Sequence, residues 1–148
     1  MKNHNSILVN YRQYKIAKLV ENYEYVIDLG FAKKPNKHLK NKHLVGVDIK
    51  KDIKKPDNYD KTICTDVMNL SNTINHNSVD AIIAGELLEH LLDPISFLKE
   101  CNKVLKKNGK IVLSTPNPHS FTEIFLTMFM IKSFFTQRNM FVFIHKDG

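Results

Sequence analysis

The spacing of apolar residues changes along the chain, and the changes predict helices and strands in alternation. From Ser6 to about Tyr23 apolar residues recur at helical spacing, which predicts an amphipathic helix. Its predicted apolar face consists of Leu8, Tyr11, Ile16, Leu19 and Val20. Five short runs rich in β-branched residues then predict strands: YEYVIDLG, HLVGVDI, KTICTD, SVDAIIAG and KIVLSTPNP. Strands alternating with helices predict an α/β fold with a parallel sheet and right-handed crossovers.

The stretch between the last two predicted strands has the clearest helix boundaries. Asp93 is suited to cap a helix, and Pro94 is suited to the first helical position. The predicted apolar stripe consists of Leu98, Cys101, Val104 and Leu105. Lys106 and Lys107 suit the negative end of the helix dipole, and Asn108–Gly109 predicts the stop.

The composition narrows the possible classes of protein. A chain of 148 residues fits a single domain with one core. The formal charge of +7 comes almost entirely from lysine, and Arg12 and Arg138 are the two arginines. Specific nucleic-acid binding is therefore not expected, because the bidentate contacts that commonly read guanine or clamp phosphate come from the planar guanidinium fork of arginine.

No segment predicts secretion or membrane insertion. The opening MKNHNSILVNYRQ lacks the apolar core of a signal peptide, and the hydrophobic run 121–131 is too short to cross a bilayer. A cytoplasmic location is expected. Cys64 and Cys101 are expected to be buried free thiols.

Three predicted strands end in aspartate, namely Asp28, Asp48 and Asp66. The carboxyl ends of parallel strands share one sheet edge, where open α/β sheets bind ligands. Asp48 follows Asp28 by 20 residues, the separation expected for an acid that accepts from ribose hydroxyls. This pattern suits NAD or S-adenosylmethionine. The first-strand loop contains Gly30 alone where a dinucleotide loop needs three glycines, which counts against NAD.

A longer stretch makes a resemblance specific. SVDAIIAGELLEHLLDPISFLKECNKVLKKNGKIVLSTPNP, together with VIDLG, VGVDI and ICTD, resembles class I S-adenosylmethionine-dependent methyltransferases of the type 11/12-like group. The resemblance implies a Rossmann-like three-layer sandwich with a mostly parallel sheet of order 3-2-1-4-5, lacking the last strands of the usual seven. It divides residues 1–148, as one domain, into a lead-in helix over 1–23, a cofactor-binding core over 24–118 and a Phe-rich segment over 119–148. A truncated form of this kind would leave an exposed sheet edge that allows a homodimer.

The resemblance also implies a role for each residue of a site for S-adenosylmethionine. In chain order the cofactor-binding residues would be Asp28 and Gly30 at the methionine part, Asp48 at the ribose, Asp66 and Val67 at the adenine, and Gly85 and Glu86 at the methionine and sulfonium end. The loop departs from the family pattern at Phe31, Ala32 and Pro35, so the contacts to the carboxypropyl group stay open. The alternative is that Phe31 packs as a plug.

The implied activity is methyl transfer to a small-molecule or sugar hydroxyl. His90 and His119 are candidate general bases, although each histidine also suits a packed turn. STPNPHSFTEIF resembles methyltransferases of sugar pathways, which favours a glycan-precursor acceptor. The alternatives are a catalytically inactive scaffold or interaction module, and an NAD-binding oxidoreductase.

A metal site is a separate hypothesis. ELLEH is similar to a Glu-x-x-Glu-His set that binds a divalent ion in some RNA and quinone-precursor methyltransferases. If a helical turn begins at Glu86, then Glu86, Glu89 and His90 share one face, and His145 would be a fourth ligand. Many members of the family have similar residues without a metal.

Overall fold

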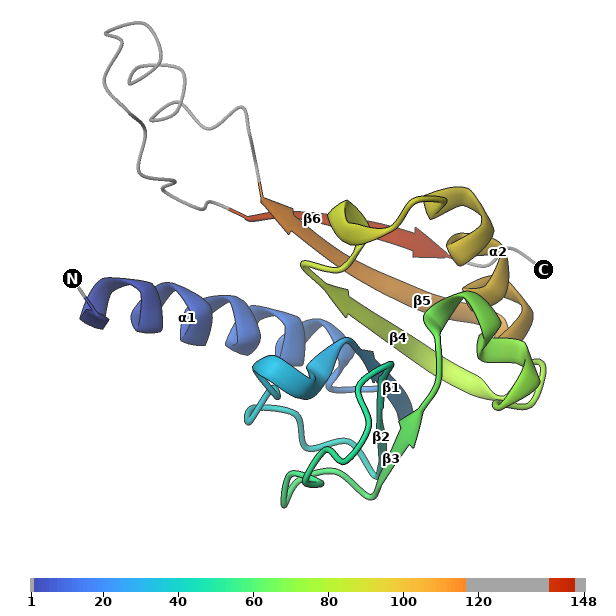
Figure 1. Ribbon diagram of the computed structural model, residues 1–148, viewed down its shortest axis with the longest axis horizontal. Helices are drawn as coiled ribbons and strands as arrows, with labels where there is room; N and C mark the ends of the chain where they lie inside the picture. Colours follow the sequence, from blue (N-terminus) through green and yellow to red (C-terminus); the bar gives the residue numbers. More distant parts are fainter. Residues whose placement is uncertain (1, 117–138, 146–148) are drawn as a thin grey trace, which may run out of the picture.

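The chain forms a sheet with helices on both faces (Figure 1). The computed structural model describes residues 2–116 and 139–145, and within them the sheet has six strands in the order β3-β2-β1-β4-β5-β6. The strands are β1 Tyr25–Leu29, β2 His43–Asp48, β3 Lys61–Cys64, β4 Val79–Gly85, β5 Leu105–Pro116 and β6 Asn139–His145. Strands β1 to β5 are parallel, which confirms the predicted order 3-2-1-4-5. Strand β6 is antiparallel to β5, so one further strand follows the parallel set.

Two apolar clusters on opposite faces of the sheet make this a three-layer structure. The helices are α1 Lys2–Val20 and α2 Pro94–Val104, and the 3-10 turns are η1 Phe31–Lys33, η2 Val67–Asn72 and η3 Leu88–His90. Along β1 the side chains alternate between the layers, with Val26 facing α1 and Ile27 facing α2 and η2. Both residues are fully buried, as expected for a central strand covered on both faces.

The apolar face predicted for α1 differs from the observed buried face at two neighbouring positions. Ile16 and Val20 are buried as predicted, but Tyr11 is 58% exposed. Arg12 is buried instead, at 9% exposure. A charged side chain occupies the inward position because it forms an ion pair there with Glu86.

The α2 helix begins as predicted and ends earlier. The Ser96 amide donates to the Asp93 carboxylate over 3.0 Å, and Pro94 is the first helical residue. The helix ends at Val104 rather than near Lys107 because Leu105 already pairs with Val79 in the sheet. The predicted last turn is therefore the first part of β5.

The two cysteines have different environments. Cys101 is fully buried, and burial raises the pKa of its thiol to about 12. Cys64 is exposed, so its predicted burial is wrong. It is the last residue of a four-residue strand at the edge of the sheet, where one side has no neighbouring strand among the described residues.

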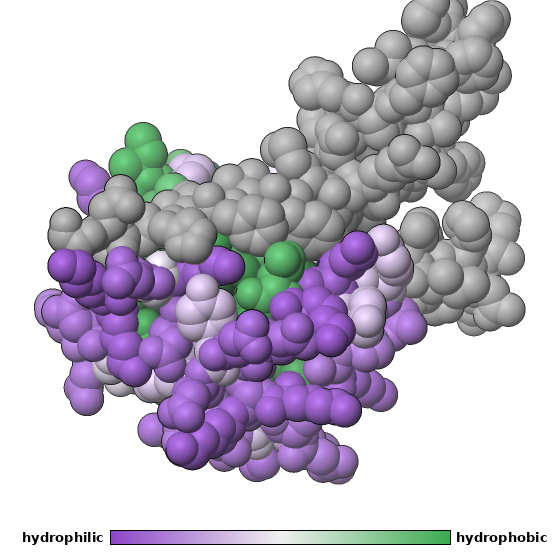
Figure 2. All heavy atoms as spheres, turned by 180° about the vertical axis from the view of Figure 1, so that it is seen from behind, coloured by the Kyte–Doolittle hydropathy of each residue, from purple (hydrophilic) through white to green (hydrophobic). Residues whose placement is uncertain are grey.

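The described residues form a mainly hydrophilic surface on the face that Figure 2 shows. Seen from behind, hydrophobic residues show only in small areas between polar ones (Figure 2). Within residues 2–116 and 139–145, no helix is long and apolar enough to cross a membrane.

Candidate functional site

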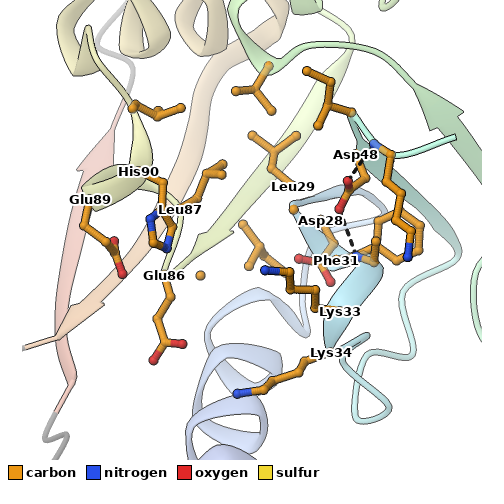
Figure 3. Close-up of a pocket in the computed structure, with 18 of the residues that line it drawn as sticks. Asp28, Leu29, Phe31, Lys33, Lys34, Asp48, Glu86, Leu87, Glu89 and His90 are labelled. Atoms are coloured by element: carbon orange, nitrogen blue, oxygen red, sulfur yellow. Dashed lines mark hydrogen bonds between the residues drawn. The ribbon is translucent and has the colours of Figure 1, made fainter. Parts of the chain in front are cut away.

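A cavity of about 970 Å³ opens at the carboxyl ends of β1, β2, β3 and β4. Residues from α1 also line it. In the close-up, Phe31, Lys33 and Asp48 lie on one side of the cavity, and Glu86 and His90 lie on the other (Figure 3). Its volume is in the range of cofactor sites.

All but one of the site residues predicted from the sequence line this cavity. They are Asp28, Gly30, Asp48, Asp66, Val67, Gly85, Glu86 and His90. The three aspartates therefore meet at one edge of the sheet, as predicted. His119 lies outside the described residues.

The Asp48 carboxylate links the loop after β1 to the segment after β2. Its Oδ2 accepts from the Ala32 amide over 3.0 Å, and its Oδ1 accepts from the Lys50 amide over 2.9 Å (Figure 3). An ionised carboxylate has about four acceptor sites. Asp48 therefore keeps acceptor capacity for two further donors on a ligand.

Asp66, like Asp48, both fixes the local backbone and lines the cavity. Its Oδ1 accepts from the Met68 amide over 2.9 Å and so caps η2. Val67 is the first residue of this turn and is 8% exposed. The cap therefore places the Asp66 carboxylate next to the apolar side chain of Val67 in the part of the cavity that follows β3.

Asp28 is the most buried carboxylate of the site. It is 6% exposed and accepts a hydrogen bond from the Tyr59 hydroxyl. Burial raises the pKa of Asp28 to about 7, against the opposing effects of the Tyr59 hydrogen bond and the Arg12 charge. The neutral and charged forms of Asp28 are therefore both populated near neutral pH.

Arg12 and Glu86 form an ion pair at the cavity, with side chains 10% and 20% exposed. Glu86 follows β4 and has a left-handed backbone, with φ of 53°. Its amide donates to the Ser114 carbonyl over 2.7 Å, which anchors this conformation. Burial lowers the pKa of Arg12, whereas the charges of Glu89 and Asp28 oppose the shift, so the guanidinium stays protonated.

Residues 28–113, more than half of the chain, match a family model described as a methyltransferase domain. The chain belongs to this methyltransferase family. The class I S-adenosylmethionine-dependent methyltransferase family predicted from the sequence is confirmed, and S-adenosylmethionine is the cofactor of that family.

Curated relatives match short segments of the methyltransferase domain. A 45-residue segment is 40% identical to a protein of Mycobacterium tuberculosis named a probable S-adenosylmethionine-dependent methyltransferase. It covers 30% of this chain and 16% of that relative. A 59-residue segment is 34% identical to a ubiquinone biosynthesis O-methyltransferase of Haemophilus ducreyi, and it covers 40% of this chain and 25% of the relative.

Solved structures share the fold of the methyltransferase domain. A SAM-dependent methyltransferase from Archaeoglobus fulgidus superposes with a TM-score of 0.61 at 22% identity, over 80% of this chain and 56% of that chain. A SAM-dependent methyltransferase from Thermotoga maritima superposes with a TM-score of 0.63 at 16% identity, over 99% of this chain and 69% of that chain. At these identities the likeness establishes the fold alone.

In the loop after β1 of the methyltransferase domain, Phe31 occupies a position where further glycines would be expected, and its side chain packs in the core. Phe31 is 3% exposed and stacks on Tyr59 with ring centroids 5.2 Å apart. Its ring lies over Gly46 of β2, where an added Cβ would come within 2.6 Å of the ring. The plug expected as the alternative for Phe31 is therefore present, and it forms part of the wall of the cavity.

This packing predicts a stability effect. Gly46→Ala is expected to lower the free energy of unfolding by about 1–3 kcal/mol, because the new methyl group overpacks the Phe31 ring. Urea unfolding followed by circular dichroism measures it. In a Phe31→Leu background the same substitution should cost less, and Gly85→Ala is the control, since its Cβ would meet nothing nearer than the Ser114 hydroxyl at 3.5 Å. An equal cost in both backgrounds would show that the ring is not the obstacle.

The metal hypothesis assumed a helical turn that begins at Glu86, and the structure has no such turn there. The η3 turn begins at Leu88, so Glu86 lies before it and does not share a helical face with Glu89 and His90. In the part of the chain that the structure describes, no three His, Cys, Asp or Glu side chains are grouped to hold a metal ion. Glu86 is instead engaged with Arg12.

Proposed function

We propose that this chain binds S-adenosylmethionine in the cavity at the carboxyl ends of β1 to β4 and transfers its methyl group to a small-molecule acceptor. One observation carries the proposal. Asp28, Asp48 and Asp66, from the ends of three adjacent strands, line a single cavity. Such a row supplies acceptors for hydroxyl and amino groups and contains no glycine-rich cradle for a pyrophosphate, which favours an adenosyl ligand over a dinucleotide.

The residues present fit this cofactor. We assign Asp48 to the ribose hydroxyls because its carboxylate retains acceptor sites beyond its two amide partners. We assign Asp66 and Val67 to the adenine end, where a carboxylate lies next to a buried apolar residue. Asp28, Gly30, Gly85 and Glu86 border the remaining end. When bound, S-adenosylmethionine supplies a methyl group already activated on a sulfonium, so these residues mainly bind and orient.

A hydroxyl acceptor is the second part of the proposal. The Haemophilus ducreyi relative is named an O-methyltransferase, which supports an oxygen nucleophile on a small molecule. A sugar hydroxyl is the more specific acceptor that the sequence suggests. His90 lies at the cavity with an exposed side chain, where it could accept the proton of an acceptor hydroxyl.

The oligomeric state and the location of the protein are separate predictions. Among the described strands, β3 and β6 form the edges of the sheet, and we predict that such an edge allows a homodimer. A cytoplasmic location is also a prediction.

Thermal unfolding with a panel of cofactors tests this function. S-adenosylhomocysteine, the demethylated product, is expected to raise the melting temperature, because a ligand at 100 times its Kd stabilises the folded state by about 2.7 kcal/mol. NAD and NADH should leave the melting temperature unchanged. A shift with NAD alone would favour the oxidoreductase, and no shift with any ligand would favour the inactive scaffold.

A further inference from the structure

One face of the sheet is covered by a single layer, made of α1 and the segments 30–42 and 49–60. Buried residues of all three belong to the same apolar cluster (Figure 1). Side chains also connect them. Gln13 of α1 donates to the Lys34 carbonyl over 3.0 Å, and Asn58 donates to the Leu39 carbonyl over 3.2 Å. The outer side chains of the three segments therefore belong to one surface.

The layers on the two faces of the sheet have opposite charge. Residues 9–24, 30–42 and 49–60 contain twelve basic and five acidic residues, a formal charge of +7. The segments 65–78 and 86–104, which cover the other face, contain two basic and five acidic residues, a formal charge of −3. A chain that was merely rich in lysine would have positive charge on both faces. The positive charge is instead specific to the α1 layer.

Several lysines of the α1 layer are free to contact a partner. Lys18 pairs with Glu21 over 2.7 Å, and Lys42 pairs with Glu24 over 3.7 Å. Within the part of the chain that the structure describes, five exposed lysines of this layer form no ion pair and do not line the cavity. These residues, termed the lysine face, are Lys15, Lys37, Lys40, Lys51 and Lys54.

Two exposed tyrosines of α1 adjoin the lysine face. Tyr11 is 58% exposed and Tyr14 is 46% exposed, and their spacing of three residues places them on the same side of the helix. The Lys15 ammonium lies 5.4 Å from the centre of the Tyr11 ring. Tyr14 makes an edge contact with His38 of the segment 30–42, with ring centroids 5.9 Å apart. The surface of this layer therefore combines cations with aromatic rings.

We propose that the lysine face, together with Tyr11 and Tyr14, binds the surface of a membrane that contains anionic phospholipids. Lysine is a flexible point charge, so it suits a layer of phosphate groups without fixed positions. Tyrosine is enriched at the level of the lipid headgroups, because its ring is apolar and its hydroxyl group is polar.

A nucleic acid fits this surface less well than a membrane. Arg12 is the single arginine of the α1 layer, and it is buried in its ion pair with Glu86. The layer therefore has no exposed guanidinium fork for a phosphate or a base edge. The proposal is also independent of the cofactor assigned to the cavity, because no residue of the lysine face lines it.

Co-sedimentation with lipid vesicles tests the proposal. The wild-type chain is expected to bind vesicles of phosphatidylcholine with about 30% phosphatidylglycerol, and not vesicles of phosphatidylcholine alone. Each lysine close to an anionic surface contributes about fivefold to binding, so the double variant Lys37→Gln/Lys40→Gln should bind about tenfold more weakly or less. The double variant Lys99→Gln/Lys107→Gln is the matched control, since it removes the same charge from exposed positions outside the α1 layer. It should weaken binding by less than about threefold.

Two further variants and a second probe complete the test. Lys51→Gln/Lys54→Gln should show the same loss as the first pair, and circular dichroism checks that each variant is folded. Tyr11→Ser should weaken vesicle binding severalfold without a change of charge. Polyuridylate RNA, at the same phosphate concentration as the vesicles, is the competing anionic probe.

Three results would overturn the proposal. The first is wild-type protein that does not bind the anionic vesicles. The second is an equal loss in the lysine-face variants and in the control variant, which would assign the attraction to net charge alone. The third is tighter binding to polyuridylate than to vesicles, unaffected by Tyr11→Ser, which would assign the lysine face to a nucleic acid.

Discussion

Asp48→Ala is expected to weaken S-adenosylhomocysteine binding by about a hundredfold, the largest effect of any single substitution in the cavity. The reason is that vicinal ribose hydroxyls would each donate to one charged acceptor, and a hydrogen bond to a charged group is worth about 1.5–3 kcal/mol. Two such bonds at the lower end of that range already correspond to a hundredfold change in Kd. Calorimetric titration of wild-type and variant protein measures the loss.

Asp48 also fixes two loops, so the ribose contact must be separated from loop damage. Its carboxylate accepts from Ala32 and Lys50, and a loosened loop would weaken any ligand in the cavity. Adenosine and 2′,3′-dideoxyadenosine distinguish the two effects. Wild-type protein should prefer adenosine, and Asp48→Ala should lose that preference. Asp57→Ala removes the same charge from an exposed position outside the cavity and serves as the control, while an unchanged Kd in Asp48→Ala would refute its ribose role.

The fold and the row of aspartates could be predicted because their information is local. A strand buried on both faces, such as β4, has an uninterrupted apolar run, and a parallel sheet places the carboxyl ends of its strands together. Asp28 and Asp48 lie at the ends of two such runs, and Asp66 follows the short edge strand β3 by two residues. Their shared cavity was therefore a consequence of topology, with no need to know the side-chain contacts.

The contacts that complete the cavity could not be predicted, because they join residues without a local pattern. Phe31 fits over Gly46 only because β1 and β2 are neighbours, and nothing in either segment alone specifies the pair. Tyr59 reaches Asp28 from 31 residues away, out of a loop with no regular period. Arg12 interrupts the apolar face of α1, and a lone arginine at a helix position facing inward was the one available indication of a buried ion pair.

Ionisation of Asp28 is expected to lower the free energy of unfolding as pH rises, opposite to the usual effect of a paired carboxylate. Burial raises the pKa of Asp28 in the folded protein to about 7, whereas its ordinary value is 3.8. A carboxyl group with a raised folded-state pKa contributes its stability below the ordinary value, and that contribution is lost as pH rises through about 7. The difference of about three units corresponds to about 4 kcal/mol lost between pH 4 and pH 8.

Asp28→Asn isolates this contribution, because asparagine resembles the neutral carboxyl group and can still accept from the Tyr59 hydroxyl. Urea unfolding of wild-type and variant protein at pH 5, 7 and 9 should give a stability difference that grows with pH in favour of Asp28→Asn. Glu100, whose pKa the Lys103 hydrogen bond lowers to about 2, changes stability only in the acid range and is common to both proteins. Tyr59→Phe removes a hydrogen bond that lowers the Asp28 pKa, so the wild-type pH dependence should move to higher pH in that variant. Parallel stability curves for wild-type and Asp28→Asn from pH 5 to pH 9 would instead show that Asp28 ionises in the folded protein near its ordinary pKa.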